Sequence, residues 1–269
     1  LIFIFWGIAV LPVKSGIKVL LSVITIAIGF SILATNPQGG YFWHRWDNDV
    51  RIDWDDEQEE EHPWSEQQFS ETMDSSTEFA VLNMDAAAGE FVLSGVTSEL
   101  FEFYTEGNVG PYEATTRKAG EDRVVIDFDH KKFRGRHNLH NTVEMRLNRN
   151  PLWTMNIDIG AADLEMDLTA YRVEKVDIDG GASAIKLKIG DKHPKTKVNI
   201  DAGAAGIKIK VPRESACEVH TSTVLSGRDL DGFNKIDRGL FQTPNFSDSA
   251  NQVMITIDAA VSGVKVERY

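Results

Sequence analysis

The fold is decided by Ile157-Asp158-Ile159-Gly160-Ala161-Ala162-Asp163-Leu164, because the pattern of this stretch returns along the chain. The pattern is an apolar residue, an Asp and five mostly small residues, with the next large apolar residue six positions after the Asp. This cassette occurs five times, with its Asp at Asp85, Asp158, Asp179, Asp201 and Asp258. The three central copies are 21 and 22 residues apart. A repeat period of about twenty residues is typical of a solenoid.

Each central cassette is followed by a segment in which apolar and charged residues alternate. Ile185, Leu187 and Ile189, for example, alternate with Lys186 and Lys188. In a β-strand this period of two places the apolar side chains on one face and the charged ones on the other. We therefore predict strands that bury their apolar face in a core, with small residues forming the corner of each coil.

The repeat also predicts which charged residues lie beside each other, because equivalent positions in stacked coils are about 4.8 Å apart. Glu165 is expected beside Lys186, and Asp167 beside Lys188. The next interface is like-charged, with Lys186 beside Lys208. Exposed pairs of this kind contribute at most about 1 kcal/mol, so the stability has to come from the core.

The cassette Asp residues form a predicted column of which Asp158, Asp179 and Asp201 are the centre. One interpretation is a bound cation. The simpler one is that each Asp caps the amides of its own turn, since two such charges about 4.8 Å apart in water cost only about 0.9 kcal/mol. A second predicted column, of mostly polar residues two positions earlier, lies on the outer face: Asn83, Asn156, Asp177, Asn199 and Thr256.

Charge is concentrated in one segment. The 269 residues carry a net charge of −13, but residues 47–74 alone hold twelve acidic residues against the single base Arg51. The rest of the chain is nearly neutral, which argues against binding to nucleic acid. Cys217 is the only cysteine, so an intrachain disulfide, a Cys-based zinc cluster and a thiol redox pair are excluded.

Residues 1–34 are predicted to form a transmembrane helical hairpin whose first helix is truncated. Ile17–Ala34 contains one charge, Lys18, and as a helix would be roughly 27 Å long, close to the thickness of the hydrocarbon layer. A buried core helix is the alternative, but no polar face is present. A cleaved signal peptide is disfavoured because two apolar runs occur. Aromatic residues expected at the membrane interface follow the hairpin: Tyr41, Phe42, Trp43 and Trp46.

The charges that flank the hairpin bear on membrane orientation. Lys14 and Lys18 favour a cytoplasmic loop, which places the large domain outside the cytoplasm, whereas Arg45 and Arg51 at the other end oppose this. We expect a multi-pass protein of the bacterial cytoplasmic membrane with an extracytoplasmic domain.

Residues 35–76 are expected to hold the aromatic interface and a solvated acidic linker, and residues 77–269 the β-solenoid domain. A calcium-loop interpretation of residues 47–53 fails, because Arg51 stands among the would-be ligands and no central Gly is present.

A basic segment, residues 130–149, contains His130, His137 and His140 together with Arg134 and Arg136. Three interpretations stay open: a metal or anion site, a docking surface for lipid headgroups or an acidic partner, and a solvated hairpin loop. The absence of helical periodicity and of a nearby Cys disfavours a metal.

The order of these features resembles a known group of proteins. An apolar hairpin and an acidic linker are followed by Asn150–Ile157, by the Asp-Gly/Ala cassettes and by Val211-Pro212-Arg213-Glu214. This order resembles bacterial membrane proteins of the LiaF type and their toast-rack β-solenoid relatives, some of which are described as candidate adhesins. The resemblance implies a membrane-anchored regulator of a cell-envelope stress response that works with a sensor kinase and a response regulator. It implies no catalytic residues.

We therefore expect an all-β solenoid that binds a protein partner and needs no cofactor. A surface adhesin or structural solenoid is the alternative. A polysaccharide-active enzyme is disfavoured, because Asp163, Glu165 and Asp167 are expected on an outer face beside lysines. The candidate interaction surface consists of Lys186, Lys188, Lys208, Lys210, Arg134 and Arg136.

Overall fold

The computed structural model describes residues 64–130, 139–247 and 249–269. The predicted hairpin of residues 1–34, the interface aromatics Tyr41, Phe42, Trp43 and Trp46, and Arg134, Arg136 and His137 lie outside these ranges. Within them, no helix is long and apolar enough to cross a membrane.

The described part of the chain is all-β, as the cassettes predict. Its strands are β1 (Ser65–Glu71), β2 (Phe79–Val96), β3 (Phe101–Gly107), β4 (Tyr112–Lys118), β5 (Arg123–His130), β6 (Asn141–Leu147), β7 (Leu152–Asp167), β8 (Arg172–Lys188), β9 (Lys195–Val211), β10 (Ala216–Leu230), β11 (Asn234–Asp237), β12 (Leu240–Gln242) and β13 (Gln252–Arg268).

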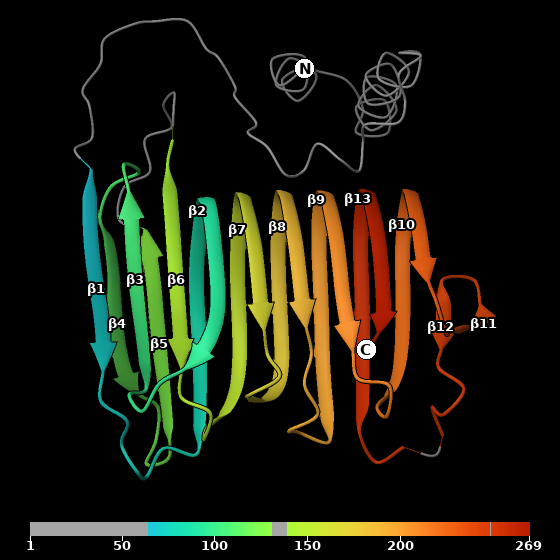
Figure 1. Ribbon diagram of the computed structural model, residues 1–269, viewed down its shortest axis with the longest axis horizontal. Helices are drawn as coiled ribbons and strands as arrows, with labels where there is room; N and C mark the ends of the chain where they lie inside the picture. The colour runs from blue at the N-terminus through green and yellow to red at the C-terminus, as the bar shows by residue number, and fades with distance from the viewer. Residues whose placement is uncertain (1–63, 131–138, 248) are drawn as a thin grey trace, which may run out of the picture. The chain divides into compact units, whose positions relative to one another are not determined.

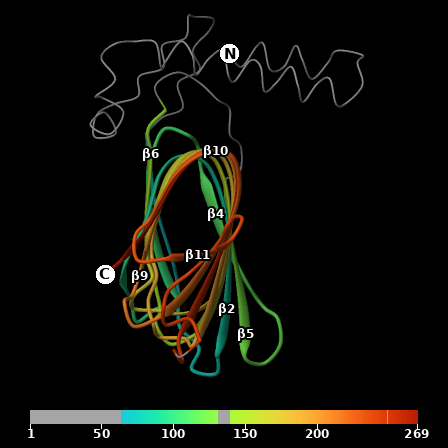
Figure 2. The same ribbon diagram turned by 90° about the vertical axis from the view of Figure 1, so that its right-hand side faces the viewer.

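Six of these strands are long and bend back on themselves to form arches. They stack in the order β2-β7-β8-β9-β13-β10, and neighbours pair in parallel. Figure 1 shows each arch rising on one side of the stack and descending on the other, and Figure 2 shows the arches nested behind each other. We call the part of an arch before the bend its first limb and the part after the bend its second limb.

The cassette lies at the bend, but it does not separate two strands. In β7 the buried residues alternate up to Ile159, then Gly160 and Ala161 both face outward, and burial resumes at Ala162 and Leu164. Two successive outward residues shift the period-two pattern by one position, and the chain turns its apolar side back toward the same core. The predicted corner is therefore a bend within one continuous strand.

The strand register confirms both predicted columns, that of the cassette Asp residues and that of the polar residues two positions earlier. The cassette Asp residues pair in one row across the arches: Asp85, Asp158, Asp179, Asp201 and Asp258. The sequence suggests that the last cassette simply closes the chain after an interruption of the stack. The structure instead inserts β13 between β9 and β10, so the end arch is β10.

Close approach between neighbouring arches explains one glycine of the bend. A Cβ added to Gly181 would lie 2.7 Å from the carbonyl oxygen of Gly160 in the arch before it. That oxygen belongs to the backbone and cannot rotate away. The spacing of the arches at the bend therefore depends on the missing side chain.

Single strands extend the two limbs beyond β2. The second limbs continue through β6, β3 and β1, and the first limbs through β5 and β4. The structure places β1 within the segment for which the sequence predicts a linker. Phe69 of β1 packs edge-on against Phe128, and the side chain of Gln67 exchanges two hydrogen bonds with the backbone of Tyr112 in β4 (2.9 and 3.3 Å). These contacts hold the two limbs together at this end.

The core runs the length of the stack between the limbs. Trp153 is 0% exposed, and its indole N–H donates to the carbonyl oxygen of Asn148 at 2.8 Å. Tyr112 and Phe103 pack on Phe128 with ring centroids 4.9 Å apart in each pair. Burial of such side chains stabilises the fold by roughly 1.5–3 kcal/mol each, whereas the exposed ion pairs contribute far less.

Cys217 offers a probe of the end arch. Its thiol is fully buried, and burial raises the pKa of Cys217 to about 12. Since the thiolate is the reactive form, we expect native protein at pH 8 to react with a thiol reagent only when β10 opens. The rate should rise to that of an unstructured thiol in denaturant. A native rate equal to the denatured rate would show that β10 is not packed as described.

Candidate interaction surface

The second limbs carry the predicted ion pairs on their outer face. Lys186 Nζ lies 3.4 Å from Glu165 Oε2, and Lys188 Nζ lies 3.1 Å from Asp167 Oδ2. Both pairs join β7 to β8 in the predicted register. The predicted like-charged contact is also present, because Lys186 pairs with Lys208 in the next arch.

Asp167 accepts three hydrogen bonds from neighbouring residues. Burial raises the pKa of Asp167, but hydrogen bonds from the Thr169 hydroxyl (2.6 Å), its amide (3.0 Å) and Lys188 outweigh this effect. The net result is a pKa below the ordinary value. The stabilisation it provides is present above the unfolded-state pKa and is lost as the pH falls through the lower folded-state value.

The lysine row continues into the later arches. Lys208 pairs in register with Lys265 of β13, and Lys265 Nζ lies between Glu267 (2.8 Å) and Asp229 (3.3 Å). A hydrogen bond from Lys265 lowers the pKa of Glu267. Lys210 forms no ion pair with any described residue. The basic part of this face is therefore only partly neutralised by the chain itself.

The same outer face is acidic on the other side of the β7–β8 boundary. We call the outward residues of β1, β3, β6, β2 and of the second limb of β7 the acidic half, and those of β8, β9, β13 and β10 the basic half. The acidic half holds Glu66, Glu90, Glu102, Glu106, Glu144, Asp163, Glu165 and Asp167, with Arg146 as its one cation. The basic half holds Lys186, Lys188, Lys208, Lys210 and Lys265, with Asp229 and Glu267 as its acids.

The first-limb face has no such division. Its centre is the predicted polar column, in which Asn156 donates to Asn83 (2.8 Å) and Asn199 donates to Asp177 (2.7 Å). Lys175 forms an ion pair with Asp177 on this face. Charges of both signs alternate here, and amide ladders join the arches.

The column of cassette Asp residues lines a shallow groove at the bends. Asp85, Asp158 and Asp179 face it together with Leu139. The expectation that each Asp caps its own turn is wrong. The carboxylates of Asp158, Asp179 and Asp201 form no hydrogen bond with the described residues, and each of these residues lies within a continuous strand and not in a turn. Across the described ranges, no three acidic, His or Cys residues are grouped to hold a metal ion.

His130 and His140, the two described histidines of the basic segment, make different contacts. A ring nitrogen of His130 lies 2.9 Å from the carbonyl oxygen of Val109. His140 is exposed and stacks on Trp64, with ring centroids 5.1 Å apart. The metal interpretation gains nothing from these two positions.

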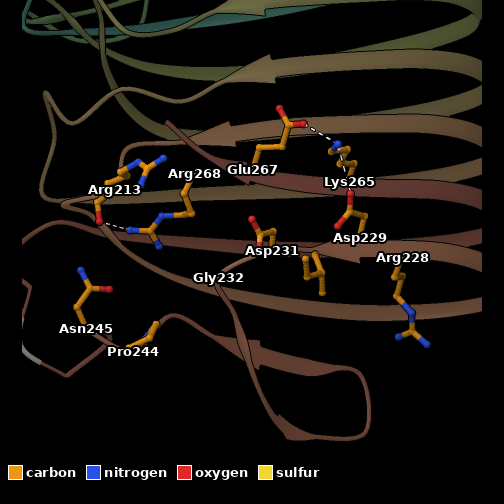
Figure 3. Close-up of a pocket in the computed structure, with 11 residues that line it drawn as sticks. Arg213, Arg228, Asp229, Asp231, Gly232, Pro244, Asn245, Lys265, Glu267 and Arg268 are labelled. Atoms are coloured by element: carbon orange, nitrogen blue, oxygen red, sulfur yellow. Dashed lines mark hydrogen bonds and ion pairs between the residues drawn. The ribbon is translucent and has the colours of Figure 1, made fainter.

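Figure 3 shows an open depression at the β10 end that the sequence did not indicate. Arg213, Arg228 and Arg268 line it, with Lys265 between Asp229 and Glu267. Arg268 donates to the carbonyl oxygens of Ser215 (2.7 Å) and Arg213, so it mainly fastens the end of β13 to the loop between β9 and β10. The lining residues come from separate segments that share no local motif, and no sequence signal marks the depression.

The family described as "N-terminal domain of toast_rack, DUF2154" matches residues 55–210, more than half of the chain. The chain belongs to the toast-rack family. The match includes the first four arches of this toast-rack protein and both halves of the charged face up to β9.

One solved structure shows the same architecture. A crystal structure of a candidate cell-adhesion protein from Clostridium sporogenes superposes with a TM-score of 0.72 at 15% identity, covering 77% of this chain and 100% of that one. At this identity, the likeness shows a shared fold. Two candidate adhesins are more distant: one from Bacteroides fragilis (TM-score 0.28, 8% identity, 76% and 97% coverage) and one from Parabacteroides merdae (0.19, 9%, 77% and 96%). No curated protein matches the sequence.

Proposed function

We propose that this toast-rack protein is a non-enzymatic, membrane-anchored interaction protein that regulates a bacterial cell-envelope stress response. The observation that carries the proposal is the charged second-limb face. Its lysines lie in register across three arches and are held at fixed spacing by a rigid stack. Such a face is suited to recognising a large charged partner surface.

The arrangement of Asp163 and Glu165 also favours a non-enzymatic protein over a polysaccharide-cleaving enzyme. Asp163 and Glu165 are exposed on a flat outer face, and Glu165 is paired with Lys186. Cleavage of a glycosidic bond needs two carboxyl groups positioned on either side of the bond, with one of them held protonated. An exposed, ion-paired carboxylate on a flat sheet does not provide that arrangement.

The partner is proposed to be a membrane protein such as a sensor kinase, and the domain is proposed to lie outside the cytoplasm. The test is to place a photo-crosslinking amino acid at Lys208 in the full-length protein in cells, with Thr154 on the first-limb face as the control. We expect a kinase adduct from position 208 only. We also expect Lys186→Glu with Lys208→Glu to change the output of the stress response. No adduct together with unchanged output would contradict the proposal.

A surface adhesin is the second candidate, favoured by the fold shared with the Clostridium sporogenes protein. Protease treatment of intact cells separates the two. Cleavage of the domain at the cell surface, combined with loss of attachment to a host or abiotic surface, would favour the adhesin. A domain protected by the cell wall would exclude it.

A further inference from the structure

The division of the second-limb face into two halves of opposite charge has a direct geometric meaning. The boundary lies between β7 and β8, near the middle of the row of second limbs. A partner that covers the whole face must offer basic groups opposite the acidic half and acidic groups opposite the basic half. A second copy of the chain offers this order when it is turned around.

We propose that two copies of this chain associate through their second-limb faces, about a two-fold axis that runs parallel to the strands between β7 and β8. Rotation about this axis reverses the order of the strands and brings the two faces together. The acidic half of each copy then lies on the basic half of the other, and both contacts are equivalent, as in most homodimers.

The register predicts which residues meet. Next to the axis, Glu165 faces the second copy's Lys186, and the intrachain pair of Glu165 with Lys186 becomes part of a ring of four alternating charges. Three strands from the axis on either side, Glu144 of β6 faces the second copy's Lys265 of β13. Glu144 has no ion-pair partner among the described residues, so this contact satisfies a charge that the single chain leaves in solvent.

The size of the face fits a stable dimer. Nine strands contribute to it, and at about 4.8 Å per strand the face is about 40 Å wide. A limb of about seven residues is about 23 Å long at about 3.3 Å per residue. The resulting area of about 900 Å² per copy compares with about 800 Å² per partner in specific complexes.

The direction of the strands is compatible with the proposed membrane anchor. Of the arguments for the dimer, this is the only one that depends on that proposed anchor. β1 begins at the level of the bends, because Ser65 pairs with Gly107, which pairs with Asn141, whose side chain donates to the carbonyl oxygen of Ala88 in the β2 bend. A two-fold axis along the strands keeps the bends of both copies pointing the same way. Both chains can therefore enter from one membrane.

The test uses the purified full-length chain in a mild non-ionic detergent, with mass measured by sedimentation velocity. One variant carries Lys186→Glu and Lys265→Glu, which reverses the two charges that face the second copy's Glu165 and Glu144. The other carries Glu144→Lys and Glu165→Lys, which removes two acids from the acidic half and adds two bases. We expect the unmodified chain to be dimeric, with a dissociation constant that rises as salt is added. Each variant alone should dissociate at least about tenfold more readily, because every reversal counts twice in a symmetric dimer.

Mixing the two variants tests directly whether the acidic half of one copy binds the basic half of the other. Their faces are complementary again, so an equimolar mixture should restore dimers that contain one copy of each. The control variant, Lys195→Glu with Lys197→Glu, makes two equivalent changes on the first-limb face and should stay dimeric. The proposal is overturned if the unmodified chain is monomeric, if both variants remain fully dimeric, or if their mixture does not pair. The second copy and the proposed kinase bind the same face, so one copy of the chain can bind only one of them at a time. The purified sample contains no kinase, so these outcomes are independent of the regulatory function.

Discussion

Trp153→Ala is expected to lower the free energy of unfolding by about 4 kcal/mol or more. Truncation of a buried Trp leaves a cavity that costs about 3–5 kcal/mol, and the carbonyl oxygen of Asn148 loses its indole donor. For a domain of this size the melting temperature should fall by roughly 10 °C. Thermal unfolding followed by the far-ultraviolet circular dichroism of the sheet measures the change.

Two further variants give this measurement its controls. Trp64→Ala makes the same chemical change at a side chain that is 52% exposed, and its effect should be about 0.5 kcal/mol or less. Trp153→Phe keeps most of the volume and removes the N–H donor, so it should fall between the two. Equal melting temperatures for the two alanine variants would show that Trp153 is not a core residue.

Gly181→Val is expected to cost about 3 kcal/mol, near the upper end of what overpacking usually costs. The first added carbon already lies 2.7 Å from the carbonyl oxygen of Gly160, and the next arch is also close, since a Cβ on Gly203 would lie 3.0 Å from the carbonyl oxygen of Gly181. The arches must separate at the bend, which weakens the ladder on both sides of β8. Urea unfolding compares the variant with the parent chain.

Gly227→Val is the matched control for this substitution. Nothing lies within 4 Å of a Cβ added to Gly227 in the end arch. We expect a change of about 0.5 kcal/mol or less there. If Gly181→Val is equally harmless, the bends are not packed as closely as the structure places them.

The repeat allowed the fold to be predicted in considerable detail. The spacing of the cassettes predicts the register, and the contacts of Lys186 with Glu165 and Lys188 with Asp167 follow from it. The sequence also indicates the position of the bend. Ile157 and Leu164 are both buried but seven positions apart, an odd number that a straight strand cannot accommodate on one face.

Other features depend on contacts between distant segments and could not be predicted. The acidic composition around β1 obscured the alternation that brings Phe69 to the core. The place of β13 depends on which free edge its backbone meets, and its cassette is equally suited to any arch. The opposite charges of the two halves became visible only when β1, β3 and β6 were placed beside the arches.

The position of β13 sets an order of events during synthesis. β9 and β10 are separated in space by β13, which follows both of them in the chain and is therefore made after them. While the ribosome is still translating, β9 exposes a bare edge, and β10 has no parallel neighbour to dock on. A nascent chain can therefore pair β2, β7, β8 and β9, but β13 and β10 can join the stack only after Arg268 has been translated. A message broken before the codon for Gln252 yields a product with open edges, which is the kind of surface that proteolysis and aggregation act on.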